Sequence, residues 1–212
     1  LARRAAKRHA LVAVFPELGL SAYTCDDLFH QQALLDASQA ALAAVLEGTR
    51  ELDLVLAVGL PLAVDGLLYN CAALLHRGHI LGVVPKTFLP NYREFYELRQ
   101  FAPAHAARRA TVSLAGRHEV PFGARLLFRC ASQPLLTLHM EICEDLWTPI
   151  PPSSHAALAG ATLLLNLSAS NVVVGKDGYR RQLAANQSAR CLAAYAYSAA
   201  GGGESTTDMA WD

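Results

Sequence analysis

Apolar runs of strand length recur along the chain, and most of them are apolar at nearly every position. They occupy residues 9–15, 53–60, 67–75, 79–84, 135–140, 161–167 and 191–199. A strand with one face in water alternates apolar and polar residues, whereas a continuous apolar run is typical of a strand covered on both faces. The pattern therefore predicts a largely buried sheet.

Helical patterns lie between several of these runs. They cover residues 31–48, which end at a glycine, residues 153–159 behind a Pro-Pro-Ser-Ser start, and residues 177–192. Residues 66–84 differ, because two strand patterns flank the turn HRGH there and predict a β-hairpin. The mixture predicts an α/β fold with helices packed on the outer faces of the sheet. No repeat or linker divides the sequence, so we expect one domain over residues 1–212.

Residues 85–110 form a long stretch without a clean hydrophobic period. They are rich in proline, aromatic and charged residues. Such a composition predicts an irregular surface segment or a lid. Within it, residues 92–99 (YREFYELR) have a simpler interpretation as a solvated helical turn with many charges.

Composition and charge narrow the classes of function. A chain of 212 residues with 53% hydrophobic residues can bury a core, and its 18 basic and 18 acidic side chains cancel. The charge balance disfavours nucleic acid and anionic membranes as partners, and no apolar run reaches the roughly 20 residues of a membrane span. Five scattered cysteines predict a reducing, cytoplasmic location. Neither they nor the eight histidines have the spacing of a metal site.

Three reactive side chains follow the ends of predicted strands. Glu17 and Lys86 each come directly after a proline, and Cys143 follows the run that ends at residue 140. Ligands of open α/β sheets bind beyond strand ends, so these residues could form one site. Each also has an ordinary interpretation when taken alone. A free cysteine more often packs in a core, and a lysine or glutamate at a strand end is more often solvated or salt-bridged.

The surroundings of Cys143 raise a difficulty for any catalytic role. In the stretch MEICEDLW it is flanked by Glu141, Glu144 and Asp145. Negative charges disfavour the thiolate, which is the nucleophilic form of cysteine. A reactive Cys143 therefore needs activation by groups from elsewhere in the chain.

Five stretches carry a family resemblance. FPELGLSAYTCDDLF, VVPKTFLPNYREFYELRQF, EICEDLW, NLSASN and GESTTDMAWD resemble the amino-terminal glutaminase domain of glutamine-dependent NAD synthetases, a branch of the nitrilase (carbon-nitrogen hydrolase) superfamily. The resemblance covers residues 9–212. It implies a nitrilase-like αββα sandwich with a Glu-Lys-Cys triad at Glu17, Lys86 and Cys143. It also implies a chain truncated at both ends, without the family's first strand or the synthetase domain.

The resemblance further implies how the site works. Glu17 would be the general base, Cys143 the nucleophile that forms a thioester, and Lys86 the cation that stabilises the thiolate and the oxyanion. Glu97 would support Lys86. The implied glutamine-binding residues are Tyr23, Tyr92, Phe95, Glu144, Ser170 and Lys176. The cations that the resemblance leads us to expect near position 176 include arginine, and the lysine found here offers no bidentate fork for a carboxylate.

The expected function is release of ammonia from L-glutamine, which needs no cofactor. A carboxyl-terminal synthetase domain would use that ammonia, with ATP and magnesium, to convert nicotinic acid adenine dinucleotide into NAD. The GGGES segment (201–205) lacks the Lys-Ser/Thr ending of a phosphate loop and is expected to be a flexible turn. The resemblance also implies a homo-oligomer. Two alternatives stay open, namely a free-standing amidase for another carboxamide and a non-catalytic assembly module.

Overall fold

The computed structural model describes residues 1–204 and 209–211, so most of the ESTTD segment (204–208) and part of GGGES lie outside the described residues. The α-helices are α1 (Ala2–Lys7), α2 (Gln32–Gly48), α3 (Pro152–Leu158) and α4 (Lys176–Cys191). Short 3₁₀ helices cover Asp26–His30, Glu97–Arg99, Ala104–Ala106 and Cys143–Trp147. The strands are β1 (Val12–Val14), β2 (Val55–Val64), β3 (Leu67–His76), β4 (His79–Pro85), β5 (Thr111–Leu114), β6 (Arg117–Pro121), β7 (Phe128–Arg129), β8 (Thr137–Ile142), β9 (Leu163–Leu167) and β10 (Ala194–Ser198).

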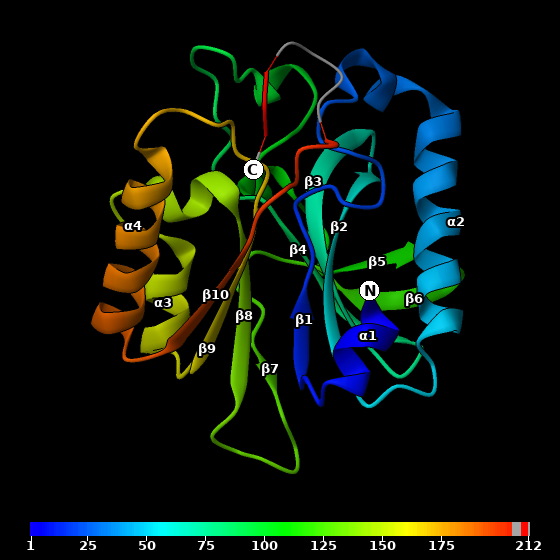
Figure 1. The fold of residues 1–212 in the computed structure, drawn as a ribbon. Helices are drawn as coiled ribbons and strands as arrows, with labels where there is room; N and C mark the ends of the chain where they lie inside the picture. The colour runs from blue at the N-terminus through cyan, green and yellow to red at the C-terminus, as the bar shows by residue number, and fades with distance from the viewer. Residues whose placement is uncertain (205–208, 212) are drawn as a thin grey trace.

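Two sheets lie face to face between layers of helices (Figure 1). In the described part of the chain, the first sheet has the order β1-β2-β3-β4 and the second has the order β10-β9-β8-β7, while β5 and β6 form a separate hairpin. Helix α2 covers the outer face of the first sheet, and α3 and α4 cover the second (Figure 1). The predicted αββα sandwich is confirmed.

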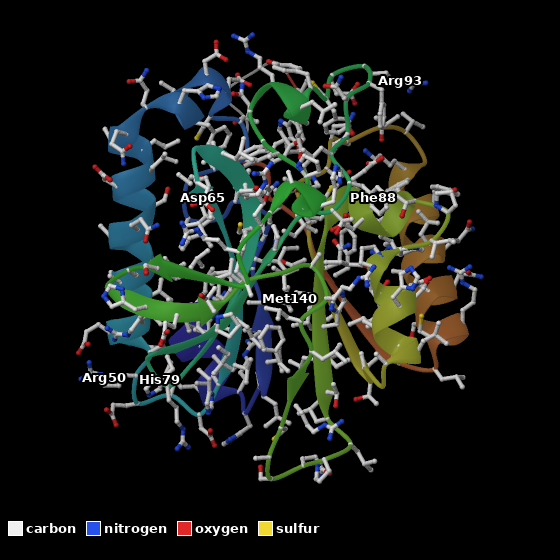
Figure 2. The ribbon with its side chains drawn as sticks, turned by 180° about the vertical axis from the view of Figure 1, so that it is seen from behind. Arg50, Asp65, His79, Phe88, Arg93 and Met140 are labelled. Atoms are coloured by element: carbon white, nitrogen blue, oxygen red, sulfur yellow. The ribbon has the colours of Figure 1, made fainter. Side chains whose placement is uncertain are left out.

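The apolar runs of both sheets meet in the middle of the molecule. Leu74 of the first sheet packs in one cluster with Met140 and Leu165 of the second, and each is at most 1% exposed. Figure 2 labels Met140 near the centre of the side-chain view. Leu42 and Leu46 of α2 close the opposite face of the first sheet. Burial on both faces explains why these strands lack alternation.

Hairpins build most of the first sheet. The predicted hairpin is confirmed, because β3 and β4 are antiparallel around the turn at Gly78. Strands β2 and β3 form a second hairpin that was not predicted, with positive φ angles at Asp65 (50°) and Gly66 (79°). Asp-Gly is a strong hairpin signal, but the predicted strand at residues 53–60 ended before Pro61, whereas β2 continues to Val64. On this edge of β2, β1 pairs only with Val55–Ala57 and so does not reach Pro61.

The residues that directly follow four of the strands lie at one end of the sandwich, which is the upper end in Figure 1. Strand β1 leads to Glu17, β4 to Lys86, β8 to Cys143, and β9 to residues 168–170. The described helices include none long and apolar enough to cross a membrane.

Residues 85–110 are only partly the surface segment that we predicted. The segment is irregular apart from two short 3₁₀ helices, and Arg93 lies at the edge of the molecule in Figure 2. However, Phe95, Glu97 and Phe101 are 5–8% exposed, so the surface prediction is wrong for these side chains. The solvated-turn interpretation of residues 92–99 is wrong for Phe95 and Glu97, although most of the other side chains of this stretch are exposed.

Candidate active site

A buried ammonium group lies at the centre of the site. The Lys86 side chain has no solvent exposure, and its Nζ donates to Glu17 Oε1 and to Glu97 Oε1, both at 2.7 Å. Burial alone would lower the pKa of Lys86, but the charges of Glu17 and Glu97 raise it well above the ordinary value. Lys86 therefore stays protonated, and the structure brings it together with Glu97 as the resemblance implied.

Glu17 is held by groups from both sheets. Besides Lys86, its Oε1 accepts from Asn70 Nδ2 at 2.7 Å, and its Oε2 accepts from the backbone N–H of Ala169 at 2.9 Å. The backbone carrying Glu17 also passes directly over Gly59, where a Cβ would lie 2.9 Å from the Glu17 carbonyl carbon. A larger residue at position 59 would push the base out of place. The carboxylate is thus fixed in one orientation.

Cys143 stands on a sharp turn between β8 and a 3₁₀ helix. Its φ of +43° is in the left-handed region, which is uncommon for a residue with a side chain. Cys143 is 7% exposed, and its Sγ lies 3.5 Å from the carbonyl oxygen of Ala169, the residue whose N–H binds Glu17. The turn brings the thiol to the same few atoms that hold the candidate base.

The charges around Cys143 keep its thiol protonated at rest. Burial raises its pKa most, the Glu17 carboxylate raises it further, and the Lys86 ammonium opposes both. The sequence neighbours were therefore not the main obstacle that we expected. Burial likewise raises the pKa of Glu97 to about 7, although Lys86 pulls it down. Because the Cys143 thiol is protonated at rest, its reaction requires a neighbouring base that accepts the proton.

The residues implied for glutamine binding form a connected group around this site. The Tyr23 hydroxyl donates to Glu97 Oε1 at 2.7 Å, and the Tyr92 hydroxyl donates to Glu144 Oε2 at 3.0 Å. The Phe95 ring lies 5.9 Å from that of Tyr92.

On the other side of the group, Lys176 Nζ lies 5.6 Å from the ring centroids of Phe95 and Trp147 and also donates to Asn171. Ser170, directly after Ala169, is 2% exposed. The structure thus brings the implied glutamine-binding residues into one region of the molecule.

Sequence reasoning missed two residues of the site. Asn70 is an amide inside the apolar run LLYNCAALL, and a polar residue in a buried strand was the signal that could have identified it. Asp145 had no expected role, yet its carboxylate accepts backbone N–H groups of Thr87, Phe88 and Ile142. Only the fold shows that these groups meet, because residues 87 and 145 come from different sheets.

Comparisons with known proteins show the family of this chain. A profile of the carbon-nitrogen hydrolase family matches residues 1–209. The glutamine-dependent NAD(+) synthetase of Mycobacterium tuberculosis is 53% identical over 203 residues, which cover 96% of this chain and 30% of that protein. A crystal structure of a glutamine-dependent NAD(+) synthetase from Cytophaga hutchinsonii matches all of this chain and 33% of its own, with a TM-score of 0.86 and 28% identity.

A third comparison concerns the fold alone. The NitN amidase of Nesterenkonia sp. AN1 matches all of this chain and 72% of its own length, with a TM-score of 0.75 and 19% identity. The present chain spans about 30% of the length of the synthetases that it matches. The family profile covers nearly every residue, and the αββα layers and the Glu-Lys-Cys cluster lie within it. The chain belongs to the carbon-nitrogen hydrolase family.

Proposed function

We propose that this chain is the glutaminase part of a glutamine-dependent NAD synthetase. One observation carries the proposal: a buried Lys86 ammonium lies between two carboxylates beside a buried thiol, at the meeting point of both sheets. Similarity to named synthetases of 53% and 50% identity over nearly the whole chain supports the substrate class. The catalytic residues would be Glu17, Lys86 and Cys143.

The first half of the reaction forms a thioester. Glu17 takes the proton of Cys143 while the sulfur attacks the side-chain carboxamide carbon of glutamine. Base assistance is needed because burial raises the pKa of this thiol above its already high ordinary value. Lys86, which stays charged, stabilises the thiolate and then the oxyanion, together with the backbone N–H of Glu144. The amide nitrogen takes up a proton and leaves as ammonia.

The second half of the reaction restores the enzyme. Glu17 activates a water molecule that attacks the thioester carbon, and the carbon–sulfur bond breaks to release glutamate. The thiol regains its proton. The two hydrogen bonds that fix Glu17, from Asn70 and Ala169, keep the same carboxylate in place for both halves.

Recognition of glutamine follows from the charges around the thiol. We assign its α-ammonium to the acceptor side of the group, where Glu144 and Tyr92 lie, and its α-carboxylate to Lys176. Phe95 and Tyr23 form walls of the pocket, and Ser170 adds a hydroxyl. Lysine at position 176 binds a carboxylate as a point charge, which predicts weaker binding than an arginine would give.

The ammonia would be used elsewhere in a longer protein. We propose that a synthetase domain uses it, with ATP and magnesium, to amidate nicotinic acid adenine dinucleotide. The described residues contain no group of three or more His, Cys, Asp or Glu side chains that could hold a metal ion. A homo-oligomer and a cytoplasmic location are also proposed, the latter supported by five free cysteines.

Ammonia release from L-glutamine tests this proposal directly. The full-length protein that contains this chain should release ammonia, Cys143→Ala should abolish the release, and Cys191→Ala should serve as a control for loss of a thiol outside the site. Full glutaminase activity in Cys143→Ala would reject the site. Equal or better turnover of simple amides would favour a free amidase, and an inactive wild-type protein would favour an assembly module.

A further inference from the structure

The Asp145 carboxylate lies between the two backbone segments that carry the proposed cation and nucleophile. Its Oδ1 accepts the N–H groups of Thr87 at 3.1 Å and Phe88 at 2.8 Å. Its Oδ2 accepts the N–H of Ile142 at 3.0 Å. Asp145 is 1% exposed, so these bonds are shielded from competition with water.

These three donors lie at the ends of strands from two different sheets. Thr87 and Phe88 directly follow Lys86, where β4 of the first sheet ends. Ile142 directly precedes Cys143, where β8 of the second sheet ends. A single side chain therefore joins the backbone next to the ammonium to the backbone next to the thiol. Figure 2 shows Phe88 beside the helical layer of the second sheet, although it follows a strand of the first.

The Asp145 carboxylate also stabilises the turn at Cys143. Cys143 has a φ of +43°, a conformation that non-glycine residues adopt only when the surrounding structure holds them there. The bond from the Ile142 N–H to Asp145 closes that turn from residue 142 to residue 145. Loss of the carboxylate would release the strained turn and the Lys86 segment together.

We propose that Asp145 is a positioning residue that sets the location of the Lys86 ammonium relative to the Cys143 sulfur. The inference rests on the proposed glutaminase function, and it assigns to Asp145 an effect on catalysis through the two backbone segments that it joins. It touches neither the thiol nor the substrate in this scheme. Small misplacements of reacting groups reduce rates by large factors, about 100-fold for 1 Å.

Glu141 provides a matched control within the same stretch. It lies two residues before Cys143, as Asp145 lies two residues after it, and it is also 1% exposed. Its carboxylate accepts the Ser153 N–H at 2.9 Å and the Tyr195 hydroxyl, so it ties β8 to α3 and β10. All of these elements belong to the second sheet or to its helical layer. Glu141 should therefore support stability without setting the distance between sheets.

The experiment compares Asp145→Asn with Glu141→Gln in the full-length protein. Each replacement keeps the side-chain volume but turns one acceptor oxygen into an NH₂ group, which cannot accept from a backbone N–H. The measurements are kcat and KM for glutamine hydrolysis, the alkylation rate of Cys143 by iodoacetamide, and the thermal midpoint of each variant. All rates are taken at a temperature where both variants are folded.

For Asp145→Asn we expect kcat to fall about 10- to 100-fold, KM to change less than threefold, and alkylation to slow, because Lys86 no longer faces the thiol correctly. Glu141→Gln should retain kcat within about threefold, even if its thermal midpoint falls as far as that of Asp145→Asn. Equal kcat losses at matched stability, or an unchanged kcat in Asp145→Asn, would overturn the proposal.

Amide hydrogen exchange in the wild-type protein gives a test that no folding defect can obscure. The N–H groups of Phe88 and Ile142 should be protected, because both bond to a buried carboxylate. Rapid exchange of either amide would show that the contact does not hold the segments. Hydrogen exchange and alkylation of Cys143 are both measured without glutamine turnover. They therefore separate failure of this inference from failure of the proposed function.

Discussion

Replacing Lys86 by alanine removes the ammonium group that contacts both Glu17 and Glu97. Both Lys86 contacts are 2.7 Å long, and the three side chains are 0–5% exposed. Removing one partner of a buried ion pair costs about 3–5 kcal/mol of folding stability, because the remaining charge is buried without compensation. The raised pKa of Glu97, about 7, favours the lower end of that range, since Glu97 can take up a proton when the ammonium is gone.

The catalytic loss should exceed what reduced stability explains. The pKa of Cys143 is raised by burial and by Glu17, and Lys86 is the nearby positive charge that lowers it. Without that charge the thiolate becomes harder to form and the oxyanion loses a stabilising partner. Loss of one such electrostatic contact reduces kcat by about 10²–10³. We therefore expect Lys86→Ala to lose thioester formation as well as turnover, with kcat/KM at least 100-fold lower.

The assay is covalent labelling of Cys143 by a glutamine-like electrophile, followed by mass spectrometry, beside measurement of ammonia release. Arg109→Ala is the control, because it also removes one positive charge but from an exposed pair with Asp65. Labelling should be slow in Lys86→Ala and normal in Arg109→Ala, at a temperature where both are folded. Normal labelling of Cys143 in Lys86→Ala would refute the assignment of Lys86 as the activating cation.

Two further predictions concern binding and pH. Lys176→Arg should lower KM for glutamine about three- to tenfold with kcat unchanged, because a guanidinium binds a carboxylate through two hydrogen bonds. Steady-state kinetics would measure both constants. An unchanged KM would argue against carboxylate binding at residue 176. Glu97 has a folded-state pKa of about 7, above the ordinary 4.5, mainly through burial. The higher folded-state pKa therefore stabilises the native state, and this contribution is fully present below about pH 4.5 and is lost as pH rises through 7. The free energy of unfolding should fall by at most about 1.4 kcal/mol per pH unit from this group. Denaturant unfolding from pH 5 to 8 should show this slope relative to Glu97→Gln, and parallel curves for the two proteins would contradict it.

Local patterns were sufficient to predict most strands of the sandwich. Runs such as residues 67–75 and 79–84 are apolar at nearly every position because both of their faces are covered, and the glycine in the turn between them marks the hairpin. Strand β2 was predicted too short, since a proline inside a run normally ends a strand. Pro61 is tolerated because its missing N–H faces an edge where β1 does not pair.

The candidate site divides into residues that chain position identified and residues whose partners only the fold reveals. Glu17, Lys86 and Cys143 each follow a strand, so chain position and side-chain chemistry together identified them. Asn70 and Asp145 act through contacts across 53 and 57–58 positions of sequence. Nothing in the sequence near these two residues shows which backbone or carboxylate they will meet, because packing of the two sheets decides it. Their roles therefore required the three-dimensional structure.

The order of the two sheets along the chain has a consequence for engineering. Strands β1 to β4 complete the first sheet before the chain crosses to the second through residues 122–127 (Figure 1). The first part carries Glu17 and Lys86, and the second carries Cys143. A protein divided within residues 122–127 would hold the base and the cation on one fragment and the nucleophile on the other. Hydrolysis by such a split enzyme would report reassembly of the fragments, since neither fragment has the complete set of reacting groups.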